Sequence, residues 1–261
     1  MKALLREAWR ESFGIRLAIW WNVFLLAVAG VGSLVDHRLI LGLNPWVKPA
    51  KFDISVIVYL ITVGALLAAL GRWPKMRATI AWGIAVSMIV ENTIISVQSL
   101  RGVRSHMNFA TTGDAIAFAV MGLFIGLNTM LVAWLLALWC TTGTRWPRPA
   151  AWGARLGLSA LLAGSMEGVL MVHRVGHTVG ASDGLPGLPF INWSTTHGDL
   201  RVAHFFALHA LQLLPLLGYA VSRRRWPERL KLATVVAGAA SYFAIVWALF
   251  SQAMAGRPLV T

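Results

Sequence analysis

The stretch ISVIVYLITVGALLAALG, residues 54–71, decides the fold class of this chain, because its eighteen residues carry no charge. About 17–25 apolar residues in one run span the hydrocarbon core of a bilayer as a helix. Six further runs are predominantly apolar and of similar length: residues 17–35, 78–98, 115–140, 156–175, 202–221 and 232–253. We therefore predict an all-α, polytopic integral membrane bundle of seven transmembrane helices, forming a single transmembrane domain over residues 1–261.

The overall composition agrees with a membrane protein. Charged residues make up 13% of the chain, whereas a soluble domain averages roughly 25%. The mean hydropathy is +0.68, so the chain has too little polar surface to be covered by water. We expect the bilayer to be its main solvent, and the bacterial cytoplasmic (inner) membrane to be its location.

The net charge of +13 does not indicate nucleic-acid binding, because the basic residues lie in short segments between the spans. Fifteen of the 23 Lys and Arg residues fall on one side when the spans alternate, among them Lys2, Arg6, Arg10 and Arg16. The positive-inside rule then places the N-terminus in the cytoplasm and, after seven spans, the C-terminus outside. The predicted partner of these charges is the anionic surface of the lipid bilayer.

The tripeptide Arg-Trp-Pro occurs three times, each time in a predicted cytoplasmic loop, at residues 72–74, 145–147 and 225–227. Trp anchors at the headgroup level, where Arg meets phosphate, and Pro favours the first turn of the next helix. One explanation is that the motif arose independently in each loop, because each loop must anchor a helix end at the membrane interface. The alternative is a helical hairpin repeated over residues 17–71, 78–140 and 156–221 and followed by a helix at 232–253.

The longest predicted outer loop covers residues 176–200 and is rich in Gly and Pro. Loops of this length in a compact domain are often functional, although some are only mobile. The loop is long enough to fold back over the helices, so we consider it a candidate lid.

Histidine is distributed unevenly across the predicted membrane. All seven histidines fall on the outer side: His37, His106, His173, His177, His197, His204 and His209. Imidazole is the commonest metal ligand and titrates near neutral pH. A single interfacial histidine is usually only a polar residue at a tolerated depth, as we expect for His37. The gathering of the others predicts a site near the outer face.

The segment at residues 197–212 carries the densest set of these side chains. Arg201 and His204 share a helical face, as do His209 and Gln212. His204 and His209 are rotated by about 140° from one another on a regular helix, so they cannot easily hold one small ion. They are expected to face two neighbouring helices or two cofactors.

The segment at residues 167–177 is the second candidate. His173 and His177 are four residues apart, a spacing that can hold a transition metal if the helix continues that far. Glu167 and Arg174 are aligned one heptad apart and are expected to pair, or else Glu167 belongs to a proton relay.

The third candidate runs from Glu91 to His106. Glu91 and Gln98 share a face of the third predicted span. An ionisable residue inside a span costs on the order of 2.5–3.5 kcal/mol on insertion scales, and a partner must offset this cost. Arg101, a histidine from another helix or water in an outer cavity are the candidates.

From these segments we predict a redox protein that binds haem b or a transition metal (Cu, Fe or Zn) and takes part in electron transfer, with quinone as a candidate partner. Axial haem ligands would come from the fifth and sixth spans, with Arg101 or Arg201 near the propionates. The candidate metal ligands are His106, His173, His177, His204 and His209. Their placement in the outer halves of helices is similar to that in bacterial multi-helix haem and haem–copper membrane proteins.

Two other functions remain open. A proton-coupled transporter would use a polar relay formed by Glu91, Gln98, Glu167 and Gln212. A non-catalytic subunit of a larger membrane complex would use its thirteen Trp and many small residues for packing against other membrane protein subunits. Motifs for nucleotide hydrolysis or zincin proteolysis are missing from the sequence, so we do not expect these activities.

Overall fold

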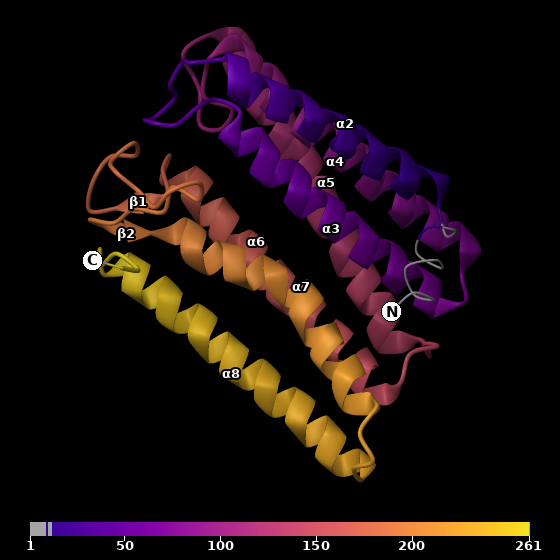
Figure 1. Ribbon diagram of the computed structural model, residues 1–261. Helices are drawn as coiled ribbons and strands as arrows, with labels where there is room; N and C mark the ends of the chain where they lie inside the picture. The colour runs from indigo at the N-terminus through magenta and orange to yellow at the C-terminus, as the bar shows by residue number, and fades with distance from the viewer. Residues whose placement is uncertain (1–8, 10–11, 261) are drawn as a thin grey trace. The chain divides into compact units, whose positions relative to one another are not determined.

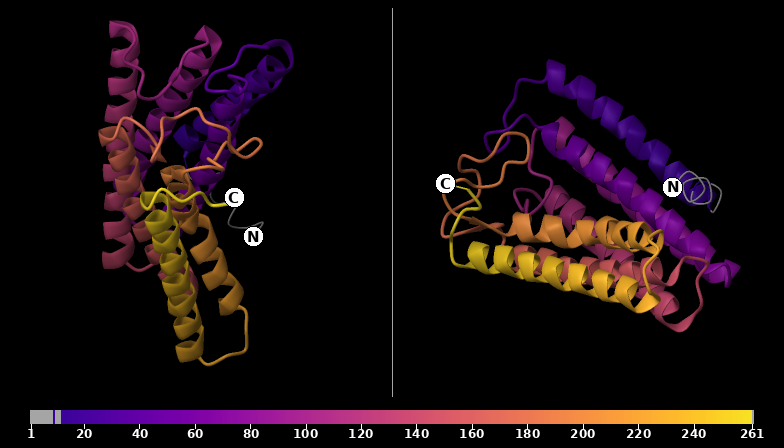
Figure 2. Two further views of the ribbon diagram at one scale, coloured as in Figure 1. Left: turned by 90° about the vertical axis from the view of Figure 1, so that its left-hand side faces the viewer. Right: turned by 60° about the horizontal axis from the view of Figure 1, so that its bottom comes forward.

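The computed structural model describes residue 9 and residues 12–260, which form long helices and one short strand pair (Figures 1 and 2). Lys2, Arg6 and Arg10, which helped to orient the N-terminus, lie outside the described residues. The elements are α2 (Phe13–Val35), α3 (Val47–Leu70), α4 (Pro74–Arg101), α5 (Thr112–Thr141), α6 (Arg148–His173), β1 (Thr178–Val179), β2 (Gly198–Asp199), α7 (Leu200–Ser222) and α8 (Glu228–Met254).

Seven of these helices are long and apolar enough to cross a membrane. A helix satisfies its own backbone hydrogen bonds, which is why it is one of the few structures that hydrocarbon tolerates. The predicted all-α class with seven apolar spans is therefore confirmed, and the chain is an integral membrane protein.

The contacts within the chain form two compact units, Met1–Trp134 and Leu135–Thr261, and α5 crosses the division. In the first unit α2 packs against both α3 and α4, which also contact each other. Leu60, Leu66 and Ile84 are fully buried there. These apolar contacts hold three helices together and bring their few polar side chains face to face.

In the second unit α6 and α7 approach closely through glycines. A Cβ added at Gly153 would lie 2.2 Å from the Leu214 carbonyl oxygen, and one at Gly218 would lie 2.4 Å from the Pro149 carbonyl oxygen. Small residues drive helix association in membranes by allowing such backbone approach. Helix α8 packs against α7 and α6 and completes this unit.

The long loop after α6 is held by short strands. β1 and β2 pair antiparallel, with Thr178 opposite Asp199 and Val179 opposite Gly198. The pair lies beside the end of α8 (Figure 1), and a Cβ at Gly198 would lie 2.0 Å from the Ala253 carbonyl oxygen. The loop is thus attached to its own unit at its two ends.

The helix boundaries differ from the predicted ones at several ends, and two of the differences affect candidate residues. Helix α3 begins at Val47 rather than at residue 54, so Asp53 belongs to the helix and not to the outer loop. Helix α6 ends at His173, and Val175 has a φ of 54°. The expectation that His173 and His177 share a helical face is therefore wrong, because the helix that would align them stops before His177.

Candidate functional site

The histidines of the second unit have separate partners. The Nδ1–H of His204 donates to the Gly164 carbonyl oxygen of α6 at 2.8 Å, whereas the Nδ1–H of His209 donates to the Phe205 carbonyl oxygen of its own helix at 2.8 Å. The His209 ring also stacks on Phe205, with ring centroids 4.0 Å apart. His173 is exposed at the end of α6. Each of these three imidazoles is thus held at a different place in the unit.

Among the residues that the structure describes, no group of three or more His, Cys, Asp and Glu side chains is arranged to hold a metal ion. His177 contacts two carboxylates. Its Nδ1 lies 3.4 Å from Asp183 Oδ1 and 3.6 Å from Asp199 Oδ1. The arrangement is an imidazole between two carboxylates, at the start of the loop.

Asp199 is the centre of the polar network that fixes this loop. It is the N-cap of α7 and is only 2% exposed. The Arg201 backbone N–H donates to its Oδ1 at 3.0 Å, and the Arg201 guanidinium contacts both carboxylate oxygens at 2.9 and 2.6 Å. The Ser194 backbone N–H donates to Oδ2 at 2.9 Å. Both oxygens of this carboxylate therefore accept hydrogen bonds from the protein.

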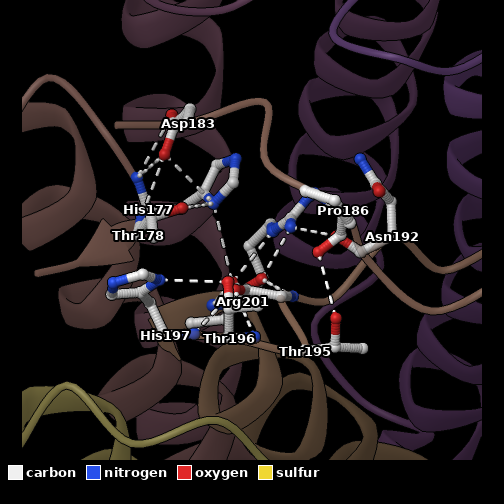
Figure 3. Close-up of polar contacts among 11 residues, drawn as sticks. His177, Thr178, Asp183, Pro186, Asn192, Thr195, Thr196, His197 and Arg201 are labelled. Carbon is white, nitrogen blue, oxygen red and sulfur yellow. Dashed lines mark hydrogen bonds and ion pairs between the residues drawn. The ribbon is translucent and has the colours of Figure 1, made fainter. Parts of the chain in front are cut away.

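The electrostatics of Asp199 follow from these contacts. Burial alone would raise its pKa, but the hydrogen bonds and charge of Arg201 outweigh burial and hold the pKa below its ordinary value. Arg201 also donates to the Asn192 carbonyl oxygen, which joins the far side of the loop to α7 (Figure 3). Arg201, a predicted partner of haem propionates, thus has a protein carboxylate as its partner.

The other end of the loop is tied by Asp183, whose carboxylate accepts from the backbone N–H groups of His177 and Thr178 at 3.2 and 3.0 Å (Figure 3). The His197 backbone N–H donates to the Ser194 hydroxyl at 3.0 Å. These contacts give the 176–200 segment an internal framework, and such a framework suits a fixed cover rather than a freely mobile loop.

In the first unit, His106 lies between a cation and an acid. The Lys48 ammonium donates to His106 Nδ1 at 3.1 Å, and His106 Nε2 lies 3.6 Å from Glu91 Oε1. Because Nδ1 accepts from Lys48, the proton of the neutral ring is on Nε2 and faces Glu91. Burial, followed by the Lys48 charge, holds the pKa of His106 well below its ordinary value. This ring therefore connects an outer cation to an intramembrane acid.

The surroundings of His106 do not favour its predicted role as a metal ligand. Phe52 and Phe118 flank its ring, with centroids 5.8 and 6.2 Å away. One ring nitrogen already faces an ammonium group, which would repel a metal cation at that position. A proton relay fits these contacts better.

Gln98 and Arg101 contact Asp114 rather than Glu91. The Gln98 amide donates to Asp114 Oδ1 at 3.0 Å, and Arg101 pairs with the same oxygen at 2.6 Å. This contact joins the outer end of α4 to the first turn of α5. Gln98 and Glu91 do share a helix, but the contacts of Gln98 give it a structural role at the helix end.

The two relay candidates of the second unit lie on different helices. Glu167 is partly buried on α6, and among the described residues its Oε2 has no hydrogen-bond partner. In that part of the chain no ion pair joins it to Arg174, so the expected pairing of the two is wrong. Gln212 is partly buried on α7. Only Glu167 therefore retains the feature expected of a proton carrier, an unpaired oxygen at membrane depth.

A cluster that the sequence did not predict joins three helices of the first unit. The Asn92 amide of α4 donates to Asp53 Oδ1 of α3 at 2.9 Å and also to Asn22 Oδ1 of α2. Asn22 and Asp53 are 0% exposed and Asn92 is 1% exposed. Asp53 lies about 9 Å along the axis from the start of α3. The signals in the sequence were the Asn residues inside two apolar runs, Asn22 in residues 17–35 and Asn92 in residues 78–98.

Comparison of the chain with protein-family models, with curated proteins and with solved structures gives no match in any of the three. The roles of Glu91, His106 and Asp53 accordingly rest on their geometry and chemistry.

Proposed function

We propose that this integral membrane protein is a proton-coupled transporter in which Glu91 carries the proton. The observation that supports it is the sequence of contacts from Lys48 through His106 to Glu91. Glu91 is 6% exposed, and among the described residues its Oε2 has no hydrogen-bond partner. An ionisable side chain kept at membrane depth is costly, and such side chains commonly mark proton pathways.

A proton can enter along these contacts without separating charges widely. His106 passes its Nε2 proton to the Glu91 carboxylate and takes a replacement at Nδ1 from the Lys48 ammonium. Lys48, which is only partly buried, then regains a proton from the outer solution. The two ring nitrogens of histidine suit this exchange, because one accepts while the other donates.

One polar position continues from Glu91 along α4 within the first unit. Ser87 is buried one turn further toward the start of the helix. Its hydroxyl offers a hydrogen-bonding position beyond Glu91. It supports a pathway that is not confined to the end of α4 near His106.

The experiment uses the purified protein in liposomes that contain a pH-sensitive dye. Gradients of monovalent cations, anions and amino acids are imposed one at a time, and the internal pH is followed. At least one gradient should move protons through the wild-type protein and not through Glu91→Gln. The control is Glu228→Gln, because the Glu228 side chain is 47% exposed at the start of α8, and this variant should match the wild type.

A Glu91→Gln variant as active as the wild type would contradict the proposal. So would a wild-type protein that moves protons under no gradient, a result that would favour a non-catalytic subunit of a larger membrane complex.

A redox protein that binds haem b is the second candidate, and one contact favours it. The Nδ1–H of His204 is held by the Gly164 carbonyl oxygen, which leaves Nε2 as the basic nitrogen. Metal-bound histidines usually donate their other ring N–H to such an acceptor. Protein prepared with haem available would then show a Soret band that is lost in His204→Ala and kept in His37→Ala. A colourless protein would exclude this function and the quinone-linked electron transfer expected with it.

A further inference from the structure

The carboxylate of Asp53 is buried without a compensating positive charge. Its hydrogen-bond partner is the neutral amide of Asn92, and no ion pair reaches it within the described part of the chain. A buried charge must be paired, bound to a cation or neutralised by a proton. Asp53 therefore needs a ligand that brings one positive charge.

Oxygen atoms without partners occur on the two helices that meet at Asp53. Among the described residues, Asp53 Oδ2, Asn92 Oδ1 and Ser96 Oγ have no hydrogen-bond partner. Ser96 follows Asn92 by four residues, so the two side chains share a face of α4. Asp53 and Asn92 are 0% and 1% exposed. Buried polar atoms normally find partners, so unpartnered oxygens on Asp53 and on its partner Asn92, with a third one turn along α4, point to a ligand that they share.

The donor atoms select the class of ligand. Carboxylate, amide and hydroxyl oxygens are the ligands of hard cations rather than of soft transition metals. Asn22, Asn92 and Ser96 are neutral, so the set carries one negative charge, which a monovalent cation balances. A divalent cation would leave a net positive charge inside the hydrocarbon, at a high cost in free energy.

We propose that Asp53, Asn92 and Asn22 bind Na⁺ inside the membrane, with Ser96 as a further oxygen donor. This inference deepens the proposed function, on which its consequence for transport rests: Na⁺ would be the ion exchanged for the proton of Glu91. Rotating the Asn92 amide about its last bond interchanges its nitrogen and oxygen. Its oxygen then faces the oxygens of Asp53 and Asn22, an arrangement that is repulsive unless a cation lies among them.

The experiment measures the labelling of buried carboxyl groups by an apolar carbodiimide in the intact, detergent-solubilised protein. Labelled Asp53 and Glu167 are quantified separately by mass spectrometry of peptides, while NaCl replaces choline chloride at constant ionic strength. Labelling of Asp53 should slow by about tenfold when Na⁺ reaches ten times its Kd, because only the unoccupied site reacts. Glu167 serves as the internal control, because it lies on α6, which contributes nothing to the cluster, and its labelling should not change.

Two variants test the ligand set. Asn22→Ala should raise the half-protecting Na⁺ concentration by about tenfold, the loss usual when a supporting partner of a metal site is removed. Tyr59→Phe is the matched control, because it removes a different buried hydrogen bond of this unit, the one from Tyr59 to Asn128 at 2.8 Å. Its Na⁺ protection should equal that of the wild type.

Equal labelling of Asp53 in NaCl and in choline chloride would overturn the inference. So would Na⁺ protection that is as strong at Glu167 as at Asp53. The outcomes separate the two proposals. If Na⁺ does not slow the labelling of Asp53 but the protein moves protons under another gradient, Na⁺ binding is rejected and the proposed function stands. Protection of Asp53 in a protein that moves no protons rejects transport and leaves the binding site.

Discussion

Asp53 and Asp199 are buried to the same degree but have opposite environments. Asp53 is 0% exposed and Asp199 is 2% exposed. Asp199 accepts hydrogen bonds from two backbone N–H groups and pairs with the Arg201 guanidinium. Asp53 has one neutral amide as its partner. A buried acid whose two oxygens both accept hydrogen bonds from the protein stabilises the fold. A buried acid with an oxygen that lacks a hydrogen-bond partner can bind a cation or a proton.

The largest expected effect comes from removing the carboxylate of Asp199. Asp199→Ala should lower the free energy of unfolding by about 3 kcal/mol, because it leaves the Arg201 charge without its partner. Thermal or denaturant unfolding in detergent measures this change. The comparison of the two acids fails if Asp199→Ala is as stable as the wild type.

Acidification should release the outer loop of the second unit. The pKa of Asp199 is lowered in the folded state, so its contribution is present above its unfolded value of about 4 and is lost as the pH falls through the lower folded value. Hydrogen exchange of residues 176–199 should rise over that acidic window. In Asp199→Asn the transition centred on this group should be missing, and an unchanged midpoint in that variant would contradict the assignment.

Asp53→Asn should have little effect on stability, or a small favourable one. The amide has the shape of the carboxyl group and removes the need to neutralise a buried charge. We expect the free energy of unfolding to change by less than about 1 kcal/mol, or to rise, in unfolding experiments without Na⁺. A loss as large as that of Asp199→Ala would show that Asp53 is structural as well.

The smallest effect concerns the outer end of the proton path. Lys48→Met should raise the pKa of His106 toward its ordinary value, because the Lys48 charge disfavours the protonated ring. The NMR titration of carbon-labelled histidine measures this shift, with the signal assigned by His106→Gln. Lys231→Met, in the first turn of α8, is the control and should leave it unchanged. A His106 titration that is identical with and without Lys48 would contradict the contact.

The sequence predicted the helices well because a bilayer requires long apolar runs, and such runs are visible without knowing their neighbours. It placed the start of α3 too late, since Lys48, Lys51 and Asp53 resemble loop residues until their helix partners are known. These polar residues are tolerated in the helix because the first two lie near its outer end and Asp53 faces Asn92.

The candidate site was harder to predict, because sequence gives the depth of a side chain but not the helix that it faces. The outer-side placement of His106 and Glu91 suggested chemistry, yet their contact through the His106 ring depends on how α4 and its following loop fold. The pairing of Asn22 with Asn92 depends on which helices are neighbours. His204 and His209 were both predicted to bind a cofactor, and their depth was visible in the sequence, whereas the backbone carbonyl groups that their Nδ1 atoms contact were not.

The internal pH of liposomes under an imposed Na⁺ gradient tests the central claim most directly. The account predicts that the wild-type protein moves protons against Na⁺, that Asp53→Asn and Glu91→Gln abolish the movement, and that Glu228→Gln keeps it. Proton movement in Asp53→Asn and Glu91→Gln at the wild-type rate would contradict the account.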